Sequence, residues 1–306
     1  YKTAWTLYNL HNGDEAIDKL IQVVKYFDPK KKRSTNHNLR AEALRDLTLF
    51  YGESRPADKA VAFFSQLTKG KELGECIYNL GKLYNTFSRY KEMNHFLAQY
   101  IDKEPLSPVR IKLEMLLVQG NETNRQRKEA MEHMVSASKL CQKDADWRVQ
   151  NKEIAEPECD FDFAKLNIDM AKKWWELWQK NKASSSAQEI AEYTKEAFRI
   201  HLDREDPAHP DSKSRYAFAE LLFQLGEFRK ASEQYSMAGS TSQDTQIAHD
   251  STYSSIVAFD KAMAQKKEKT DEDESLRLSK VYLEKFPTGE HAVDVKFKIG
   301  FIAYEG

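Results

Sequence analysis

The sequence predicts an all-α fold made of antiparallel helix pairs, and three observations lead to that prediction. Apolar residues recur three and four positions apart along most of the 306-residue chain, which is the period of an α-helix with one buried side. Only 11 glycines and 8 prolines are present, fewer than a fold of many turns and strands needs. Short breaks separate successive apolar stripes, as expected for turns that join paired helices.

The most regular helix pair is predicted over residues 76–105. One apolar stripe ends at a short break at Ser88 and Arg89, a second stripe follows it, and Pro105 closes the pair. Gly81 lies within the first helix, where a bulky side chain would hold a neighbouring helix away. This segment therefore predicts a hairpin that packs closely against another helix.

The same pattern recurs over residues 41–67 and 212–238. These spacings resemble the tetratricopeptide repeat (TPR), a pair of antiparallel helices of about 34 residues with small and aromatic residues at fixed positions. The resemblance covers roughly two-thirds of the chain, since partial repeats also occur near both ends. It implies a right-handed superhelical solenoid of antiparallel hairpins, in which each hairpin buries its apolar stripe against the next one.

We expect a single TPR-like solenoid over residues 1–306, truncated at both ends and flanked in the full protein by further repeats or capping helices. N-terminal repeats are expected over residues 1–141 and C-terminal repeats over residues 162–306. Residues 142–161 match the pattern poorly and predict an irregular connection or a short extra helix. Two sub-arrays hinged at this connection are the alternative.

The resemblance also implies a peptide-binding groove along the first helices of the repeats. The same groove position carries an aromatic residue in three repeats, at Tyr78, Tyr216 and Phe297. The predicted peptide-binding residues are Tyr78, Lys82, Asn85, Tyr216, Glu220, Phe223, Phe297, Phe301 and Trp175, with Glu75, Lys213 and Tyr304 at neighbouring groove positions. Aromatic anchors among polar residues suit an extended peptide or an amphipathic helix. The basic and amide residues that form the carboxylate clamp of chaperone-binding TPR members are not present at these positions.

Three of the five tryptophans, Trp174, Trp175 and Trp178, lie close together in the segment "DMAKKWWELWQK". On a helical wheel the apolar residues between positions 163 and 178 span an arc of about 200°. A one-sided surface helix needs an arc of only about 100°. We therefore predict a helix covered on two sides and interpret the cluster mainly as core, while Trp175 lies at the edge of the arc, where it could face a groove.

The charge of the chain is balanced, with 47 Lys and Arg against 48 Asp and Glu. Because this leaves a net charge of −1, no overall field would hold the protein on a polyanion, and we predict no nucleic-acid partner. We interpret the basic run from Pro29 to Arg33 as a solvated loop, and the acidic run after Thr270 as the first turn of a helix capped by that threonine. No run approaches the roughly 18 apolar residues of a membrane span, so direct membrane insertion is not expected.

The three cysteines, Cys76, Cys141 and Cys159, match neither a CxxC redox pair nor paired zinc-ligand spacing. Three thiols cannot all pair within one molecule, which slightly favours buried, inert cysteines and decides little about the compartment. The sequence contains no zinc-protease, nucleophile-elbow or phosphate-loop motif. We therefore predict neither an enzyme active site nor a bound cofactor or metal.

The expected function is a non-catalytic scaffold that binds peptide or helical segments of partner proteins within a multiprotein assembly. The linkers over residues 209–228 and 286–306 resemble those of bacterial cell-envelope TPR proteins, which favours the periplasm over the cytoplasm. Two alternatives belong to other classes: the chain is the regulatory or substrate-recruiting arm of a larger enzyme, or it self-associates through exposed repeats.

Overall fold

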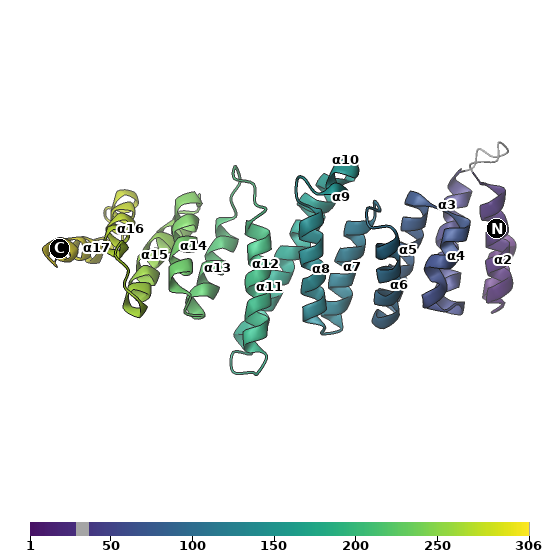
Figure 1. The fold of residues 1–306 in the computed structure, drawn as a ribbon, viewed down its shortest axis with the longest axis horizontal. Helices are drawn as coiled ribbons and strands as arrows, with labels where there is room; N and C mark the ends of the chain where they lie inside the picture. Colours follow the sequence, from purple (N-terminus) through teal and green to yellow (C-terminus); the bar gives the residue numbers. More distant parts are fainter. Residues whose placement is uncertain (29–36, 306) are drawn as a thin grey trace. The chain divides into compact units, whose positions relative to one another are not determined.

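The computed structural model describes residues 1–28 and 37–305, and over these ranges the protein is helical without any β-strand (Figure 1). The predicted all-α class is therefore confirmed. The basic run from Pro29 to Arg33 lies outside the described residues. The chain divides into two compact units, unit 1 (Tyr1–Leu166) and unit 2 (Asn167–Gly306).

Unit 1 is a succession of helices, each packed against its neighbours along the chain (Figure 1). Its elements are α1 (Lys2–Asn9), α2 (Gly13–Tyr26), α3 (His37–Ser54), the 3₁₀ turn η1 (Ala57–Lys59), α4 (Ala60–Leu67), α5 (Gly70–Thr86), α6 (Tyr90–Lys103), α7 (Arg110–Thr123), α8 (Arg127–Leu140), α9 (Asp146–Gln150), α10 (Lys152–Ala155) and the π-helix η2 (Glu156–Phe163). Besides packing on their own partners, α3 contacts α5 and α5 contacts α7. One hydrophobic core cluster runs through these helices from Ala4 to Leu117.

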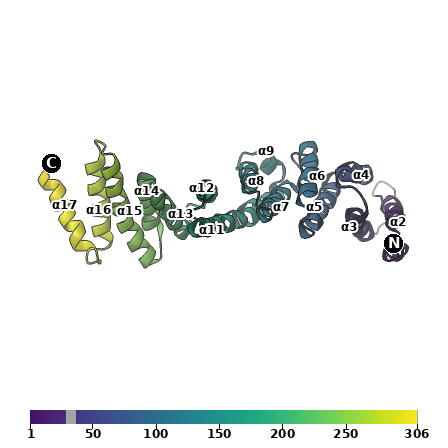
Figure 2. The same cartoon turned by 90° about the horizontal axis from the view of Figure 1, so that it is seen from below.

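Within unit 2, the helices also pack against their neighbours along the chain. Its elements are α11 (Ala164–Lys180), which begins just before the unit boundary, α12 (Ala187–Leu202), α13 (Ser212–Gln224), α14 (Phe228–Thr241), α15 (Thr245–Gln265), α16 (Asp271–Lys285) and α17 (Ala292–Glu305). Helices α14, α15 and α16 lie side by side in chain order (Figure 2). α14 and α15 approach closely at Gly239, where a β-carbon would lie 2.9 Å from the backbone nitrogen of Thr252.

The predicted close approach of α5 to a neighbouring helix occurs at Gly81. A β-carbon on Gly81 would lie 2.8 Å from Cδ2 of Leu116 on α7 and 3.4 Å from Cδ2 of Leu97 on α6. Both leucines are buried, so neither has free space into which it could withdraw. The glycine therefore allows α5 to contact both helices at once.

Four of the described hairpins close with the same turn, in which one residue adopts a left-handed conformation. These residues are His11 (φ 62°), Ser88 (φ 58°), Arg125 (φ 62°) and Gly226 (φ 78°). In each turn the following amide donates to the carbonyl five positions earlier, as Arg89 N does to Tyr84 O at 2.8 Å. This bond satisfies a carbonyl that the end of the first helix leaves unpaired. The predicted break at Ser88 and Arg89 is one of these turns.

Because only glycine adopts the left-handed conformation without steric cost, these turns predict opposite effects for two substitutions. We expect Arg125→Gly to raise the free energy of unfolding by about 1 kcal/mol, and Gly226→Ala to lower it by about 1 kcal/mol. Arg125 is exposed, and a β-carbon on Gly226 would come no closer than 3.9 Å to another group, so conformation rather than packing is tested. Urea denaturation followed by circular dichroism measures both. A change of the same sign for both would contradict the role of this turn.

The tryptophans of α11 are mostly core, as the helical wheel predicts. Trp174 is fully buried and Trp178 is 5% exposed. Trp175 is half-buried, and its ring stands edge-on to Phe198 of α12, with the centroids 6.2 Å apart. Helix α12 thus covers one edge of the Trp175 ring and leaves part of the ring in solvent.

The acidic first turn of α16 does not use the predicted threonine cap. Thr270 occupies the N-cap position, but its side chain makes no capping hydrogen bond. Asp271 is buried instead and forms a two-point ion pair with Arg229 of α14, with both N–O distances at 2.8 Å. The hydrogen bonds from Arg229 lower the pKa of Asp271 to about 2. The Asp271 carboxylate therefore links α16 to α14, in addition to lying in the first turn of α16.

Candidate functional site

The predicted groove residues of unit 1 lie along α5. Tyr78 is half-buried against the core cluster, Lys82 is exposed, and Asn85 is half-buried beside Gly120 of α7. The structure brings Tyr78 and Lys82 together, because the Lys82 ammonium lies 5.2 Å from the centroid of the Tyr78 ring. A cation at this distance interacts favourably with the face of an aromatic ring.

Two further residues extend this surface. Lys112 of α7 places its Nζ 5.8 Å from the Tyr78 ring centroid and 3.4 Å from Oε1 of Glu158 in η2. Burial raises the pKa of the Tyr78 hydroxyl, and the charge of Lys112 opposes that shift. We call the surface formed by Tyr78, Lys82, Lys112 and Glu158 the Tyr78 face.

Glu158 is the unusual member of the Tyr78 face. It is only 4% exposed, and its Oε2 atom has no hydrogen-bond partner. Burial raises the pKa of Glu158, although Lys112 acts in the opposite direction. A buried carboxylate with one uncompensated oxygen costs free energy, so the surrounding structure must hold it in place.

Sequence reasoning missed Lys112 and Glu158. Lys112 follows Tyr78 by one repeat length of about 34 residues, so a repeat register carried into residues 110–123 would have found it. Glu158 lies in a segment that matches no repeat position, and the sequence does not distinguish a buried glutamate from a surface one.

The predicted binding residues on α13 face α14, the other helix of the same hairpin. Tyr216 and Phe223 are half-buried, and their rings contact Tyr235 and Phe228 of α14 at centroid distances of 5.5 and 5.1 Å. Glu220 accepts a hydrogen bond from the buried hydroxyl of Tyr235. Burial raises the pKa of Tyr216 to about 12. These side chains therefore contribute to the packing of the α13–α14 hairpin, while each retains partial exposure.

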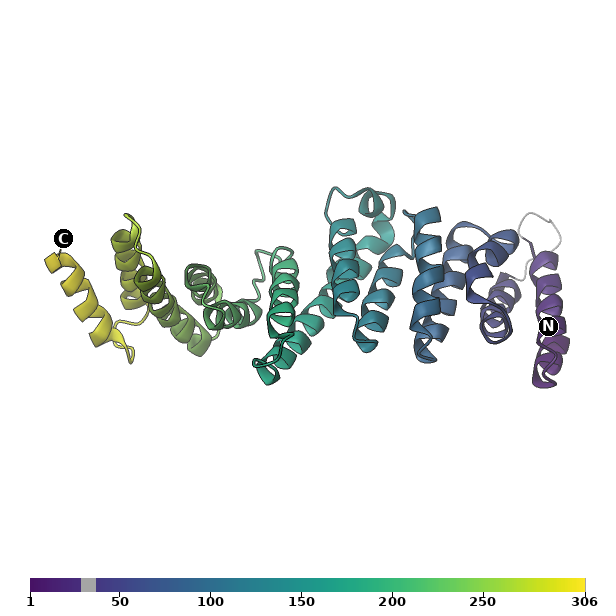
Figure 3. The ribbon, with the colours of Figure 1, turned by 60° about the horizontal axis from the view of Figure 1, so that its bottom comes forward.

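The predicted residues of α17 form an exposed apolar stripe. Phe297 is 77% exposed, Phe301 51% and Tyr304 90%, and Val293 adds a further exposed side chain on the same helix. The buried residues Ala292 and Val295 belong to the core cluster that α17 shares with α15 and α16. Helix α17 lies next to α16, with the C-terminus at its far end (Figure 3). The stripe lies on α17, whereas Trp175 packs against Phe198 of α12 and the predicted residues of α13 pack against α14.

The cysteines are buried, as the sequence slightly favoured, but Cys141 and Cys159 are joined by a disulfide. Cys141 follows the last residue of α8 and Cys159 lies within η2, with their Cα atoms 5.5 Å apart, a normal span for this bond. Cys76 remains free and buried, and burial raises the pKa of its thiol to about 12. This disulfide could not be predicted from the sequence, because only the fold of residues 142–158 brings the two cysteines together.

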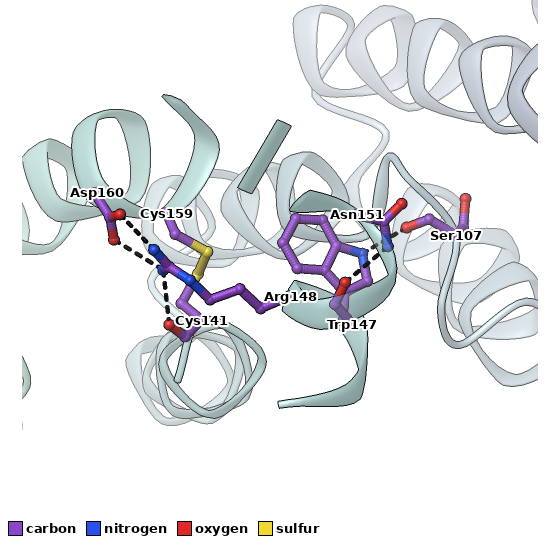
Figure 4. Close-up of a disulfide and its surroundings, with 7 residues drawn as sticks. All are labelled: Ser107, Cys141, Trp147, Arg148, Asn151, Cys159 and Asp160. Atoms are coloured by element: carbon purple, nitrogen blue, oxygen red, sulfur yellow. Dashed lines mark hydrogen bonds and ion pairs between the residues drawn. A yellow bond between two sulfur atoms is a disulfide. The ribbon is translucent and has the colours of Figure 1, made fainter. Parts of the chain in front are cut away.

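An arginine reinforces the disulfide (Figure 4). Arg148 of α9 donates from Nη1 to the carbonyl of Cys141 at 3.0 Å, and from Nη1 and Nη2 to the carboxylate of Asp160 at 2.9 and 2.6 Å. It thus joins the two chain segments that the disulfide joins. We call Cys141, Cys159, Arg148 and Asp160 the 141–159 clasp.

The loop closed by the clasp is anchored to the rest of unit 1. The fully buried Trp147 donates from its indole nitrogen to Ser107 O at 2.7 Å (Figure 4). Asn151 donates to Leu106 O at 3.2 Å. Within residues 142–161, a short turn is followed by α9, α10 and part of η2. Closing a loop of 18 residues by a disulfide stabilises a fold by about 3 kcal/mol.

One cluster contains the residue types of a hydrolase triad, but its geometry is different. Ser136 Oγ and His133 Nδ1 both bind the carboxylate of Glu114, at 2.7 Å each. In a catalytic triad the serine hydroxyl would instead bind the histidine that activates it. Among residues 1–28 and 37–305, no group of three His, Cys, Asp or Glu side chains is placed to hold a metal ion.

A cleft of about 490 Å³ lies between the first helices of unit 1. It is lined by Tyr1, Thr3, Lys19, Gln22, Val23, Tyr26, Phe27 and Leu39. It contains none of the predicted binding residues.

No protein-family profile matches the chain, and no curated protein is significantly similar to it. In the part of the chain that the structure describes, no helix has both the length and the hydropathy that crossing a membrane requires.

Proposed function

We propose that this chain is a non-catalytic TPR-like solenoid that binds a peptide or helical segment of a partner protein within a larger assembly. The recurrence of one turn geometry in four hairpins supports a repeat architecture. The contacts of α3 with α5 and of α5 with α7 support it as well, because first helices line up in this way in a helical-repeat array.

The observation that carries the proposal is the Tyr78 face. Helix α5 contributes Tyr78 and Lys82 to it, and helix α7 contributes Lys112. A ligand lying across the two helices would therefore meet an aromatic ring and two ammonium groups, while the buried Glu158 of η2 pairs with Lys112. Such a surface suits an extended segment that uses one side chain for each contact. Its half-buried tyrosine supplies apolar area at little cost in side-chain entropy.

Site-specific crosslinking in the native cell tests the proposal. We expect a photo-crosslinking amino acid in place of the exposed Lys82 to capture a partner protein, and Tyr78→Ala to reduce that capture about tenfold, as loss of an aromatic anchor does. The matched control replaces Asp102, which is exposed on α6. Equal capture at both positions, or capture unaffected by Tyr78→Ala, would reject this face as the binding site.

The 141–159 clasp supports the expected location in the bacterial cell envelope. Disulfides form and persist in oxidising compartments such as the periplasm and are rare in the cytosol. Both half-cystines are buried, which protects the bond once it has formed.

The exposed stripe of α17 favours a second function, self-association. Sedimentation velocity of the wild-type chain is expected to show a concentration-dependent dimer that Phe297→Ser abolishes, because this substitution removes an apolar contact from the stripe. Lys296→Ser, at the exposed position next to it, is the control and leaves the dimer intact. A wild-type chain that remains monomeric at high concentration would exclude this function.

A further inference from the structure

The two sulfurs of the 141–159 clasp are inaccessible in the folded chain. Cys141 is 2% exposed and Cys159 is fully buried. Forming a disulfide requires an oxidant to approach one of the thiolates closely. The bond therefore forms before η2 has packed against the end of α8.

We propose that oxidation of Cys141 and Cys159 by a disulfide donor is a maturation step that fixes η2 and thereby completes the Tyr78 face. The expected effect on partner binding rests on the function proposed above, whereas the expected effect on the structure of η2 is independent of that function.

The step balances as an ordinary exchange of thiol and disulfide. One cysteine thiolate of this chain attacks the disulfide of the donor and forms a mixed disulfide, which releases one donor thiolate. The second cysteine thiolate then attacks the sulfur of the first cysteine, so the Cys141–Cys159 bond forms and the donor leaves as a dithiol. Two electrons and two protons pass from this chain to the donor.

The link from the clasp to the Tyr78 face is a direct one along the chain. Glu158 precedes Cys159 in η2, and Asp160, which follows it, is held by Arg148. The clasp therefore fixes the residues on both sides of Cys159. Because the Oε2 atom of Glu158 is buried without a partner, this carboxylate gains hydration if η2 is released. Without the clasp we expect Glu158 to turn to solvent and leave Lys112 unpaired.

Counting thiols tests the first part of the proposal. In chain purified from an oxidising compartment and alkylated in denaturant, we expect one modified cysteine, Cys76, and after reduction three. In the folded state the disulfide is expected to resist dithiothreitol at a concentration that reduces it in denaturant, because both sulfurs are buried. Three alkylated cysteines before reduction would overturn the proposal.

Hydrogen exchange tests the second part. In Cys141→Ala/Cys159→Ala, amides of residues 146–163 are expected to exchange at least about tenfold faster than in wild type, while those of α13 and α14 stay unchanged. The control Cys76→Ala removes the free cysteine of α5 and leaves exchange in η2 unchanged. Wild-type chain produced in a reducing and in an oxidising compartment of the same host gives the same comparison without a substitution. Equal exchange in η2 for both forms would overturn the proposal.

Crosslinking at position 82, carried out with and without the Cys141–Cys159 disulfide, distinguishes failure of this inference from failure of the proposed function. Faster exchange in η2 together with lost capture at position 82 supports both. Faster exchange with no partner captured by either form sustains the structural role of the clasp and rejects the binding function. Faster exchange with undiminished capture would overturn the claim that the clasp completes the Tyr78 face.

Discussion

Trp174→Ala is expected to lower the free energy of unfolding by about 4 kcal/mol, the typical cost of truncating a buried aromatic residue. Trp174 is fully buried in α11, and its ring lies 6.0 Å from that of Tyr193 on α12. Alanine would leave a cavity that the neighbouring helices cannot close without moving as rigid elements. Urea denaturation followed by far-UV circular dichroism measures the loss.

Trp175→Ala provides the matched comparison, because the same residue type is removed from the next position of the same helix. Trp175 is half-buried, so its truncation is expected to cost only about 1.5 kcal/mol. Equal losses for the two variants would contradict the assignment of Trp174 to the core and of Trp175 to its edge. A loss of partner binding in Trp175→Ala at unchanged stability would instead indicate that its exposed edge contacts a ligand.

The helices that the sequence predicted well are those with large apolar residues on one side. The hairpin of α5 and α6 is the clearest example, since its two stripes and the break at Ser88 and Arg89 all correspond to the structure. The shared turn was only partly predictable, because Ser88 and Arg125 are not residues that signal a left-handed conformation, whereas His11 and Gly226 belong to types that adopt it more readily. Tertiary packing of the two helices imposes the conformation at Ser88 and Arg125.

Helix α15 shows a different limit of sequence analysis. Its buried side includes the small polar residues Ser251 and Ser255, which carry no hydrophobic periodicity. The close approach of α14 at Gly239 is to the neighbouring Thr252, and Ser255 O accepts a hydrogen bond from Ser232 of α14 at 2.8 Å. The helix is thus specified by close backbone contact, which a pattern of apolar residues does not reveal.

Only the part of the candidate site that lies in the regular helix pair of residues 76–105 could be predicted from the sequence. Tyr78 and Lys82 lie in the first helix of the regular pair predicted over residues 76–105, and the structure brings them together. Glu158 and the Cys141–Cys159 disulfide depend on how residues 142–163 fold back on α7 and α8. No local sequence pattern predicts the path of residues 142–163, because that path is determined by contacts with distant residues, such as the hydrogen bond from Trp147 to Ser107 O.

The largest polar effect is expected at Glu114, which is 1% exposed within the α7–α8 hairpin. Its carboxylate accepts hydrogen bonds from Arg110 Nε at 3.0 Å, and from His133 and Ser136 at 2.7 Å each. Glu114→Ala leaves the largely buried guanidinium of Arg110 without its counter-ion. Breaking a buried ion pair in this way is expected to cost about 4 kcal/mol. Glu132→Ala, at an exposed position of α8, is the control and should change stability by less than about 0.5 kcal/mol.

The contribution of Glu114 is also expected to depend on pH, in a direction that its environment determines. Burial opposes ionisation of Glu114, but the hydrogen bond from His133 and the charge of Arg110 outweigh it, so its pKa lies below the ordinary value. A carboxyl group with a lowered pKa in the folded state stabilises the fold above the pKa of the unfolded chain, about 4.3, and that stabilisation is lost as the pH falls through the folded value. The difference in unfolding free energy between wild type and Glu114→Gln should therefore narrow as the pH falls from about 6 to below about 4. Urea denaturation of both proteins across this range measures it, and a difference that widens in acid would show that Glu114 is not held ionised by its partners.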